Sequence, residues 1–240
     1  HEQKDIENIK KLRELQKELP SFCSDFFRGI ETSTSTRTRI AYAYDLKIFF
    51  QFLKTANPGT FDNPSHTLTP SDLEKLTVTD LEEYIDYLKC HPSDTNEDII
   101  NTERGLMRKV SSLRSFYSYF FRNEQIEKNP AALVRMPKLH EKEIIRLEID
   151  EVAKLLDEVE EGDKLTEKQK LYHERTKVRD LAMMSLLLGT GIRVSECVGL
   201  NINDIDLDTC GARVYRKGGK ESVIYFSDEV RDVLENYLDE

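Results

Sequence analysis

Arg193 is the residue whose type and setting point most directly to chemistry. It follows Gly189-Thr190-Gly191 after one intervening residue, and a stretch of apolar residues precedes those glycines. A guanidinium stays charged at physiological pH and presents its N–H donors in a fixed fork, which matches the non-bridging oxygens of a phosphate. An ion pair with Glu196, three residues further on, or a simply exposed arginine would explain the same spacing. The motif alone leaves these interpretations open.

Lys217 is the second candidate, 24 residues after Arg193. It lies in the glycine-rich segment 216–220, whose composition predicts the tip of a β-hairpin. A lysine there can donate a proton to a leaving oxygen when burial or neighbouring cations lower its pKa. A solvated turn lysine is the alternative. Lys220 lies in the same turn and is a candidate contact to a phosphate.

The four cysteines form no pattern of metal ligands and no dense disulfide framework: Cys23, Cys90, Cys197 and Cys210. This usage predicts a reducing, cytoplasmic location. No apolar run approaches the ~18 residues of a membrane span, so we expect no membrane partner. The chain starts at His1 without a methionine or a signal peptide, which we interpret as a trimmed start.

The elements that must position these residues follow from apolar spacing and from helix-breaking residues. Spacings of three and four residues predict helices over 1–19, 37–56, 79–88, 99–122, 148–156, 179–188 and 228–238. The helix over 179–188 is apolar nearly all round and should therefore be buried. Alternating residues predict strands over 212–215 and 222–226. Residues 160–178 are charged and weakly patterned, which predicts a loop or a solvent-facing helix.

These elements predict a mainly α protein with two domains. The helices within residues 20–135 form a compact all-α bundle, and a Pro-containing, charged linker follows it near residue 136. The last part adds a small β-hairpin to helices, which makes it α+β. The 45 acidic and 35 basic residues give a net charge of −10, but residues 141–240 hold 24 of the acidic and 15 of the basic ones.

A local basic segment changes what the net charge implies. Residues 104–138 hold eight basic and two acidic residues, and a polyanion responds to local charge because salt screens fields beyond ~10 Å. We expect phosphate contacts on one helix face and at one helix start, with solvated charges as the alternative. The candidates are Arg104, Arg108, Lys109 and Arg114, and then Arg37, Thr38 and Arg39.

Several motifs together resemble the tyrosine recombinases, or phage-integrase family, and most closely their Xer type. Residues 191–200, 203–206 and 216–220 are similar to the first catalytic motif and the following hairpin. Residues 38–46, with Phe49 and Phe50, are similar to the Thr-x₃-Tyr-x₂-Asp-Leu helix of the core-binding domain. Residues 108–120, 129–131 and 137–139 resemble its last helix and the linker. The similarity spans about residues 20–240 in the family's order.

The resemblance implies a fold and an activity. The expected fold is an N-terminal extension (1–19), a SAM-like core-binding domain (20–135), a linker (136–148) and an incomplete catalytic domain (149–240). The implied activity is site-specific DNA recombination, in which a tyrosine attacks a phosphodiester without a metal or another cofactor. Arg193 would contact the phosphate, Lys217 would act as general acid and Glu196 would orient the cations. The implied partner is double-stranded DNA, which the intact protein would bind as a homotetramer. Without DNA, a monomer is expected.

The family's second motif, His-x-x-Arg, and its nucleophilic tyrosine are not matched in this sequence. We therefore hypothesise a truncated chain that binds DNA but does not cleave it. A non-catalytic DNA-binding module of the same architecture is one alternative. An acidic helical adaptor that binds protein is another, suggested by the charge of residues 141–240.

Overall fold

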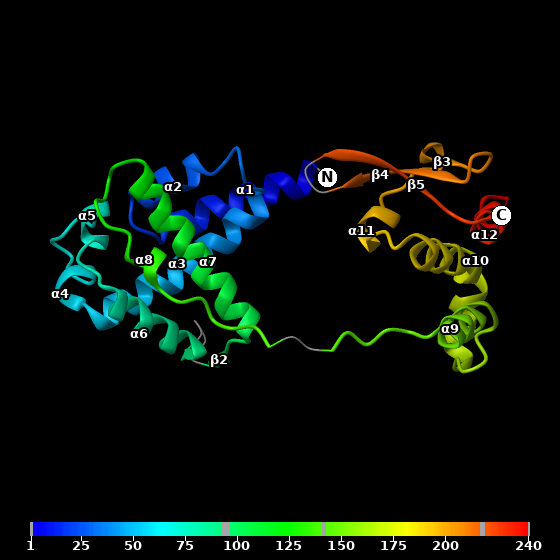
Figure 1. Ribbon diagram of the computed structural model, residues 1–240, viewed down its shortest axis with the longest axis horizontal. Helices are drawn as coiled ribbons and strands as arrows, with labels where there is room; N and C mark the ends of the chain where they lie inside the picture. The colour runs from blue at the N-terminus through cyan, green and yellow to red at the C-terminus, as the bar shows by residue number, and fades with distance from the viewer. Residues whose placement is uncertain (1, 93–96, 141–142, 217–218, 240) are drawn as a thin grey trace. The chain divides into compact units, whose positions relative to one another are not determined.

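The computed structural model describes residues 2–92, 97–140, 143–216 and 219–239 (Figure 1). The chain divides into two compact units, His1–Lys142 and Glu143–Glu240. Each is described by itself. None of the helices in the described ranges is long and apolar enough to cross a membrane.

The first unit is helical with one small hairpin. Its helices are α1 (Glu2–Lys17), α2 (Cys23–Gly29), α3 (Thr36–Ala56), α4 (Pro58–Phe61), α5 (Pro70–Leu73), α6 (Val78–Lys89), α7 (Glu103–Arg122) and α8 (Pro130–Leu133). Strands β1 (Cys90–Pro92) and β2 (Asp98–Ile100) pair antiparallel between α6 and α7. Helix α1 packs on α3, and α3 packs on α7.

The core of this unit is aromatic. Phe116 of α7 is fully buried, and its ring centroid lies 5.0 Å from that of Phe120 and 5.2 Å from that of Phe26 on α2. The contact between α2 and α7 is so close that a Cβ on Gly29 would lie 2.1 Å from the ring of Tyr119. Edge-to-face packing of this kind adds to the burial of each ring. It fixes α7, and hence its basic residues, against α2 and α3.

Two boundaries in this unit differ from the sequence prediction. The helix expected from residue 99 begins at Glu103, because Ile99 and Ile100 belong to β2 and the Thr102 hydroxyl accepts the Gly105 N–H as the helix cap. The helix expected near residue 79 begins at Val78, where Thr77 and Asp80 cap each other's backbone N–H. In both cases a threonine hydroxyl, rather than the apolar pattern, sets the helix start.

The second unit combines helices with a small sheet. Its helices are α9 (Ile149–Glu161), α10 (Glu167–Thr190), α11 (Val194–Cys197), the 3₁₀ helix η1 (Ile202–Asp204) and α12 (Asp228–Leu238). The antiparallel sheet has the order β3 (Ile205–Asp206), β4 (Gly211–Arg216), β5 (Lys220–Tyr225). Both predicted strands are present, and β3 adds a third that the alternation did not reveal.

Helix α10 confirms one of the two alternatives expected for residues 160–178, a solvent-facing helix, and corrects one other expectation. Most of residues 160–178 joins the apolar segment after it in one helix, which starts at Glu167. The apolar segment is not buried all round: Ala182 and Leu186 are buried, whereas 40% of Leu188 is exposed. Helices α9, α11 and α12 contact α10.

Candidate functional site

The junction between α10 and α11 determines where Arg193 lies. Gly191 ends α10 in the left-handed conformation (φ 66°), and its N–H donates to the Leu187 carbonyl oxygen at 2.9 Å. A residue with a Cβ rarely adopts this conformation, so the glycine permits the sharp exit. Arg193 is then extended (φ −74°, ψ 149°) as the residue that precedes α11. The Gly-x-Gly-x-Arg spacing thus encodes a turn that places the arginine at the start of one helical turn.

Glu196 holds Arg193 in two ways. Its carboxylate accepts the Arg193 backbone N–H at 3.0 Å and a guanidinium N–H at 2.8 Å. The Glu196 side chain is 5% exposed, whereas the Arg193 side chain is 70% exposed. The Arg193 backbone N–H, then its guanidinium, and the charge of Arg216 hold the pKa of Glu196 below its usual value. The pair expected as one alternative is therefore present, and it leaves most of the guanidinium accessible.

Arg216 is a cation at this site that the sequence interpretation did not select. It ends β4, pairs with Lys220 of β5 in the hairpin register, and is exposed. By the two-residue period of a strand it shares a face with Ala212 and Val214, both buried. Strand β4 packs against α11, which agrees with the influence of Arg216 on Glu196. The signal in the sequence was a second cation directly before Lys217.

Lys217 itself lies outside the described residues, so its role stays a prediction. Arg216 and Gly219 on either side of this gap are described: Gly219 adopts φ 74°, and its N–H donates to the Arg216 carbonyl oxygen at 3.1 Å. The hairpin tip thus begins at a strand end that lies near Glu196. Lys220, the other candidate in this turn, is exposed.

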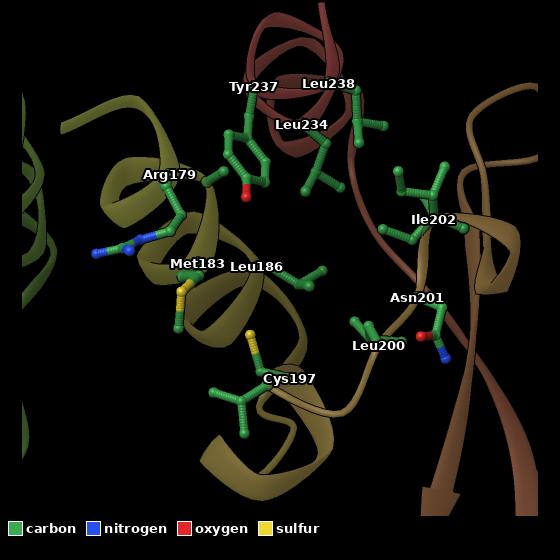
Figure 2. Close-up of a pocket in the computed structure, with 13 residues that line it drawn as sticks. Arg179, Met183, Leu186, Cys197, Leu200, Asn201, Ile202, Leu234, Tyr237 and Leu238 are labelled. Carbon is green, nitrogen blue, oxygen red and sulfur yellow. The ribbon is translucent and has the colours of Figure 1, made fainter. Parts of the chain in front are cut away.

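A cavity of about 310 Å³ in the second unit is a separate feature (Figure 2). Side chains of α10, α11, α12 and the segment that follows α11 line it, among them Leu186, Leu200 and Leu234. In the close-up the Arg179 guanidinium points away from these leucines, and it bonds Asp180 at 2.7 Å. Neither Arg193 nor Glu196 is among the described residues that line this cavity. Its apolar surface does not suit a phosphate.

On α7 the four candidate cations have different environments. Arg104 is exposed. Arg108 is 48% exposed and binds the buried Asp45 of α3 through both terminal nitrogens. Lys109 and Arg114 depart from the expectation that all four lie on the face away from the core.

Lys109 is buried, and its ammonium donates to the Asn101 side chain at 2.7 Å. On the helical wheel it falls between Leu106 and Leu113, so a charge that was expected outside lies inside. Arg114 is half-buried, and its guanidinium donates to the carbonyl oxygens of Ala131 and Val134 at the end of α8. Both side chains tie α7 to neighbouring segments of the same unit, and their contacts to phosphate stay predictions.

At the start of α3 the three candidates also diverge. Arg37 is exposed. The Thr38 N–H donates to the Ser35 hydroxyl at 3.2 Å, so the cap occupies it. The Arg39 guanidinium binds Glu31 at 2.7 Å, and its side chain is only 11% exposed. Of these three residues only Arg37 is exposed, and the phosphate contacts of Thr38 and Arg39 stay predictions.

No group of three or more His, Cys, Asp or Glu side chains in the described ranges is placed to hold a metal ion. In the second unit, the candidate site consists of Arg193, its partner Glu196 and the nearby Arg216. In the first unit, the exposed candidates for phosphate contacts are Arg37, Arg104 and Arg108. Guanidinium groups on exposed surfaces of two units are suited to contacts with an extended polyanion.

Comparisons with known proteins identify the family of this chain. The profile of the phage integrase family matches residues 145–240. Tyrosine recombinase XerC of Caldanaerobacter subterraneus is 34% identical, and the match covers 91% of this chain and 58% of that protein. Tyrosine recombinase XerS of Streptococcus uberis is 31% identical, with 96% of this chain and 70% of that protein covered. The chain belongs to the phage integrase family of tyrosine recombinases, and its relatives are of the Xer type.

Solved structures show the same fold at lower identity. A lambda integrase tetramer bound to a Holliday junction matches with a TM-score of 0.57 and 18% identity, over 90% of this chain and 55% of that chain. The XerH recombinase bound to its difH substrate matches with a TM-score of 0.55 and 14% identity, over 85% and 52%. The chain thus spans little more than half the length of several proteins that it matches.

Proposed function

We propose that this chain is the DNA-binding unit and the first part of the catalytic domain of a site-specific tyrosine recombinase. The observation that carries the proposal is the Arg193–Glu196 pair, in which a buried carboxylate fixes an arginine that is 70% exposed. Membership of the family and the cations of the first unit support it. Double-stranded DNA is the proposed partner.

The chemistry is a transesterification. A tyrosine oxygen forms a bond to the scissile phosphorus, the bond from phosphorus to the 5′-oxygen breaks, and that oxygen takes up a proton. Arg193 binds the non-bridging oxygens as negative charge grows on them. Glu196 prevents the guanidinium from turning away. By its resemblance to the family, Lys217 supplies the proton to the 5′-oxygen, and Arg216 adds positive charge next to it. Within residues 1–240 we assign no nucleophile.

The proposal extends to assembly and location. A homotetramer on DNA is proposed for the complete recombinase, since the lambda integrase relative was solved as a tetramer on a Holliday junction. Without DNA we expect this chain to be a monomer. A cytoplasmic location is proposed because all four cysteines are free thiols.

Salt-dependent binding to DNA is the first test. The full chain is titrated into a fluorescent duplex of about 30 base pairs, and anisotropy is followed between about 50 and 300 mM KCl. Each phosphate contact contributes about −0.9 to the slope of log K against log salt. We expect log K to fall with log salt with a slope of about −2 or steeper, which corresponds to two or more phosphate contacts. No binding at the lowest salt would contradict the proposal and favour the protein-binding adaptor.

A chimera tests the catalytic assignment. This chain is joined to the part of the Streptococcus uberis XerS that follows the matched region, and covalent protein–DNA product is measured on a nicked suicide substrate. Arg193→Lys should abolish the covalent product while DNA binding remains, because an ammonium cannot replace a bidentate fork. Equal amounts of covalent product from the unmodified chimera and from its Arg193→Lys variant would refute the assignment of Arg193. A chimera that binds DNA but forms no product would favour a non-catalytic module.

A further inference from the structure

Asp45 and Arg108 form an unusual pair in the first unit. Asp45 lies on α3 and is 2% exposed, whereas Arg108 lies on α7, 63 residues later, and is 48% exposed. The two carboxylate oxygens accept N–H groups from the two terminal nitrogens at 2.5 and 2.7 Å. A buried carboxylate therefore grips one edge of a guanidinium whose side chain is half open to solvent.

The surroundings of Asp45 are built to keep this carboxylate in place. The Ser112 hydroxyl, which donates to the Lys109 carbonyl oxygen at 2.9 Å, and the charge of Lys109 both help to lower the pKa of Asp45. The Tyr84 hydroxyl of α6 donates to the Asp45 main-chain carbonyl oxygen at 3.4 Å. Burial raises the pKa of Asp45, while Arg108 and Lys109 counteract the rise. Since an apolar pair of similar size could join two helices without these costs, the pair calls for a role beyond packing.

The geometry leaves one edge of Arg108 free for a second acceptor. A guanidinium has five N–H donors, and the two bonds to Asp45 use one from each terminal nitrogen. The Nε edge can still bind two oxygens of a phosphate side by side. Lys109 is buried on Asn101, and Arg114 is bound to main-chain carbonyl oxygens. Arg108 thus combines a fixed orientation with exposure, which these two neighbours do not.

We propose that Asp45 is a positioning residue that holds Arg108 in the orientation required to bind a backbone phosphate of duplex DNA. The inference rests on the proposed function, because it presupposes that the first unit binds DNA. Preordering by Asp45 removes the entropy that a free arginine side chain would lose on binding. Arg104, one helical turn before Arg108 and exposed, supplies charge without such a clamp.

The test compares matched arginine-to-lysine variants in the full chain. Arg108→Lys keeps the charge but loses the fork, and it should weaken binding to the duplex about tenfold with an unchanged salt slope. Arg122→Lys, the control at the other end of α7, should change the affinity less than about twofold, since this exposed side chain has no assigned contact to DNA. Circular dichroism melting curves ensure that every titration is made on folded protein.

A double-mutant cycle separates positioning from mere stability. Asp45→Asn also removes a negative charge, but that effect is the same in the wild-type and Arg108→Lys backgrounds and cancels in the cycle. We expect Asp45→Asn to weaken DNA binding about fivefold more in the wild-type background than in the Arg108→Lys background. Equal effects in both backgrounds, or equal affinities of Arg108→Lys and Arg122→Lys, would overturn the inference. If the unmodified chain shows no salt-dependent binding, the proposed function fails instead, which the first titration reveals.

Discussion

Replacing Arg108 with methionine would leave the Asp45 carboxylate buried without its guanidinium. Asp45 is 2% exposed, and the charge of Lys109 would be the main favourable electrostatic influence left to it. Removing one member of a buried ion pair costs about 3–5 kcal/mol. Since a domain is typically stable by about 5–15 kcal/mol, the variant should lose a large share of the stability of the first unit.

The loss should depend on pH in a defined direction. Burial raises the pKa of Asp45 above its ordinary value of 3.8, so the folded state binds its proton more readily than the unfolded state does. The contribution of this group to stability therefore falls as pH rises through the interval between the two pKa values. Arg108→Met removes an interaction that lowers this pKa and widens the interval. The difference from wild type should thus be greatest near pH 7 and smaller near pH 4.5.

Urea unfolding followed by circular dichroism at both pH values measures this difference. Hydrogen exchange of peptides from α3 and α7 assigns the loss to the first unit. The double variant Asp45→Asn/Arg108→Met is the control, because it removes the unpaired charge and should recover more than half of the lost stability. A loss below about 1 kcal/mol for Arg108→Met, or a double variant as unstable as the single one, would refute this explanation of the pair.

Three further changes test the fold and the site. Gly191→Ala should cost about 1–2 kcal/mol of stability in the second unit because residue 191 has a positive φ. The control Gly59→Ala, whose Cβ would meet no atom within 4 Å, should cost less than about 0.5 kcal/mol. Urea unfolding of the two variants compares these losses. Phe116→Ala should cost about 3–5 kcal/mol and Phe121→Ala, 46% exposed, less than about 0.5 kcal/mol by the same method; similar losses would contradict the described core. Glu196→Gln should lower stability at neutral pH and lose that effect as pH falls through the lowered pKa of Glu196; a pH-independent difference would argue against the ion pair.

The sequence predicted the helices and the hairpin of this chain well because each carries a local signal. The three- and four-residue spacing of apolar side chains in α3 and α7 reflects one buried face. The β1–β2 hairpin was missed because its strands have three residues each and because Ile99 and Ile100 also fit a helical stripe. Short strands are stabilised by their pairing rather than by their own pattern.

The site was predicted in part, for a related reason. Arg193 and Glu196 are three residues apart, so the sequence could reveal their pair. The partners of Arg108 and Arg114 lie 63 and 17–20 residues away, and a single sequence gives no measure of such contacts. Lys109 was misjudged because its charge was given more weight than its place on the helical wheel.

The central claim is that both units of this chain contribute cations to one DNA duplex. Hydrogen exchange of the full chain, with and without a duplex of about 30 base pairs at low salt, tests it most directly. We expect slower exchange on DNA in peptides of α7 and also in those that cover residues 190–200 and 211–226. Protection confined to α7, with unchanged exchange around Arg193 and β4, would contradict the claim.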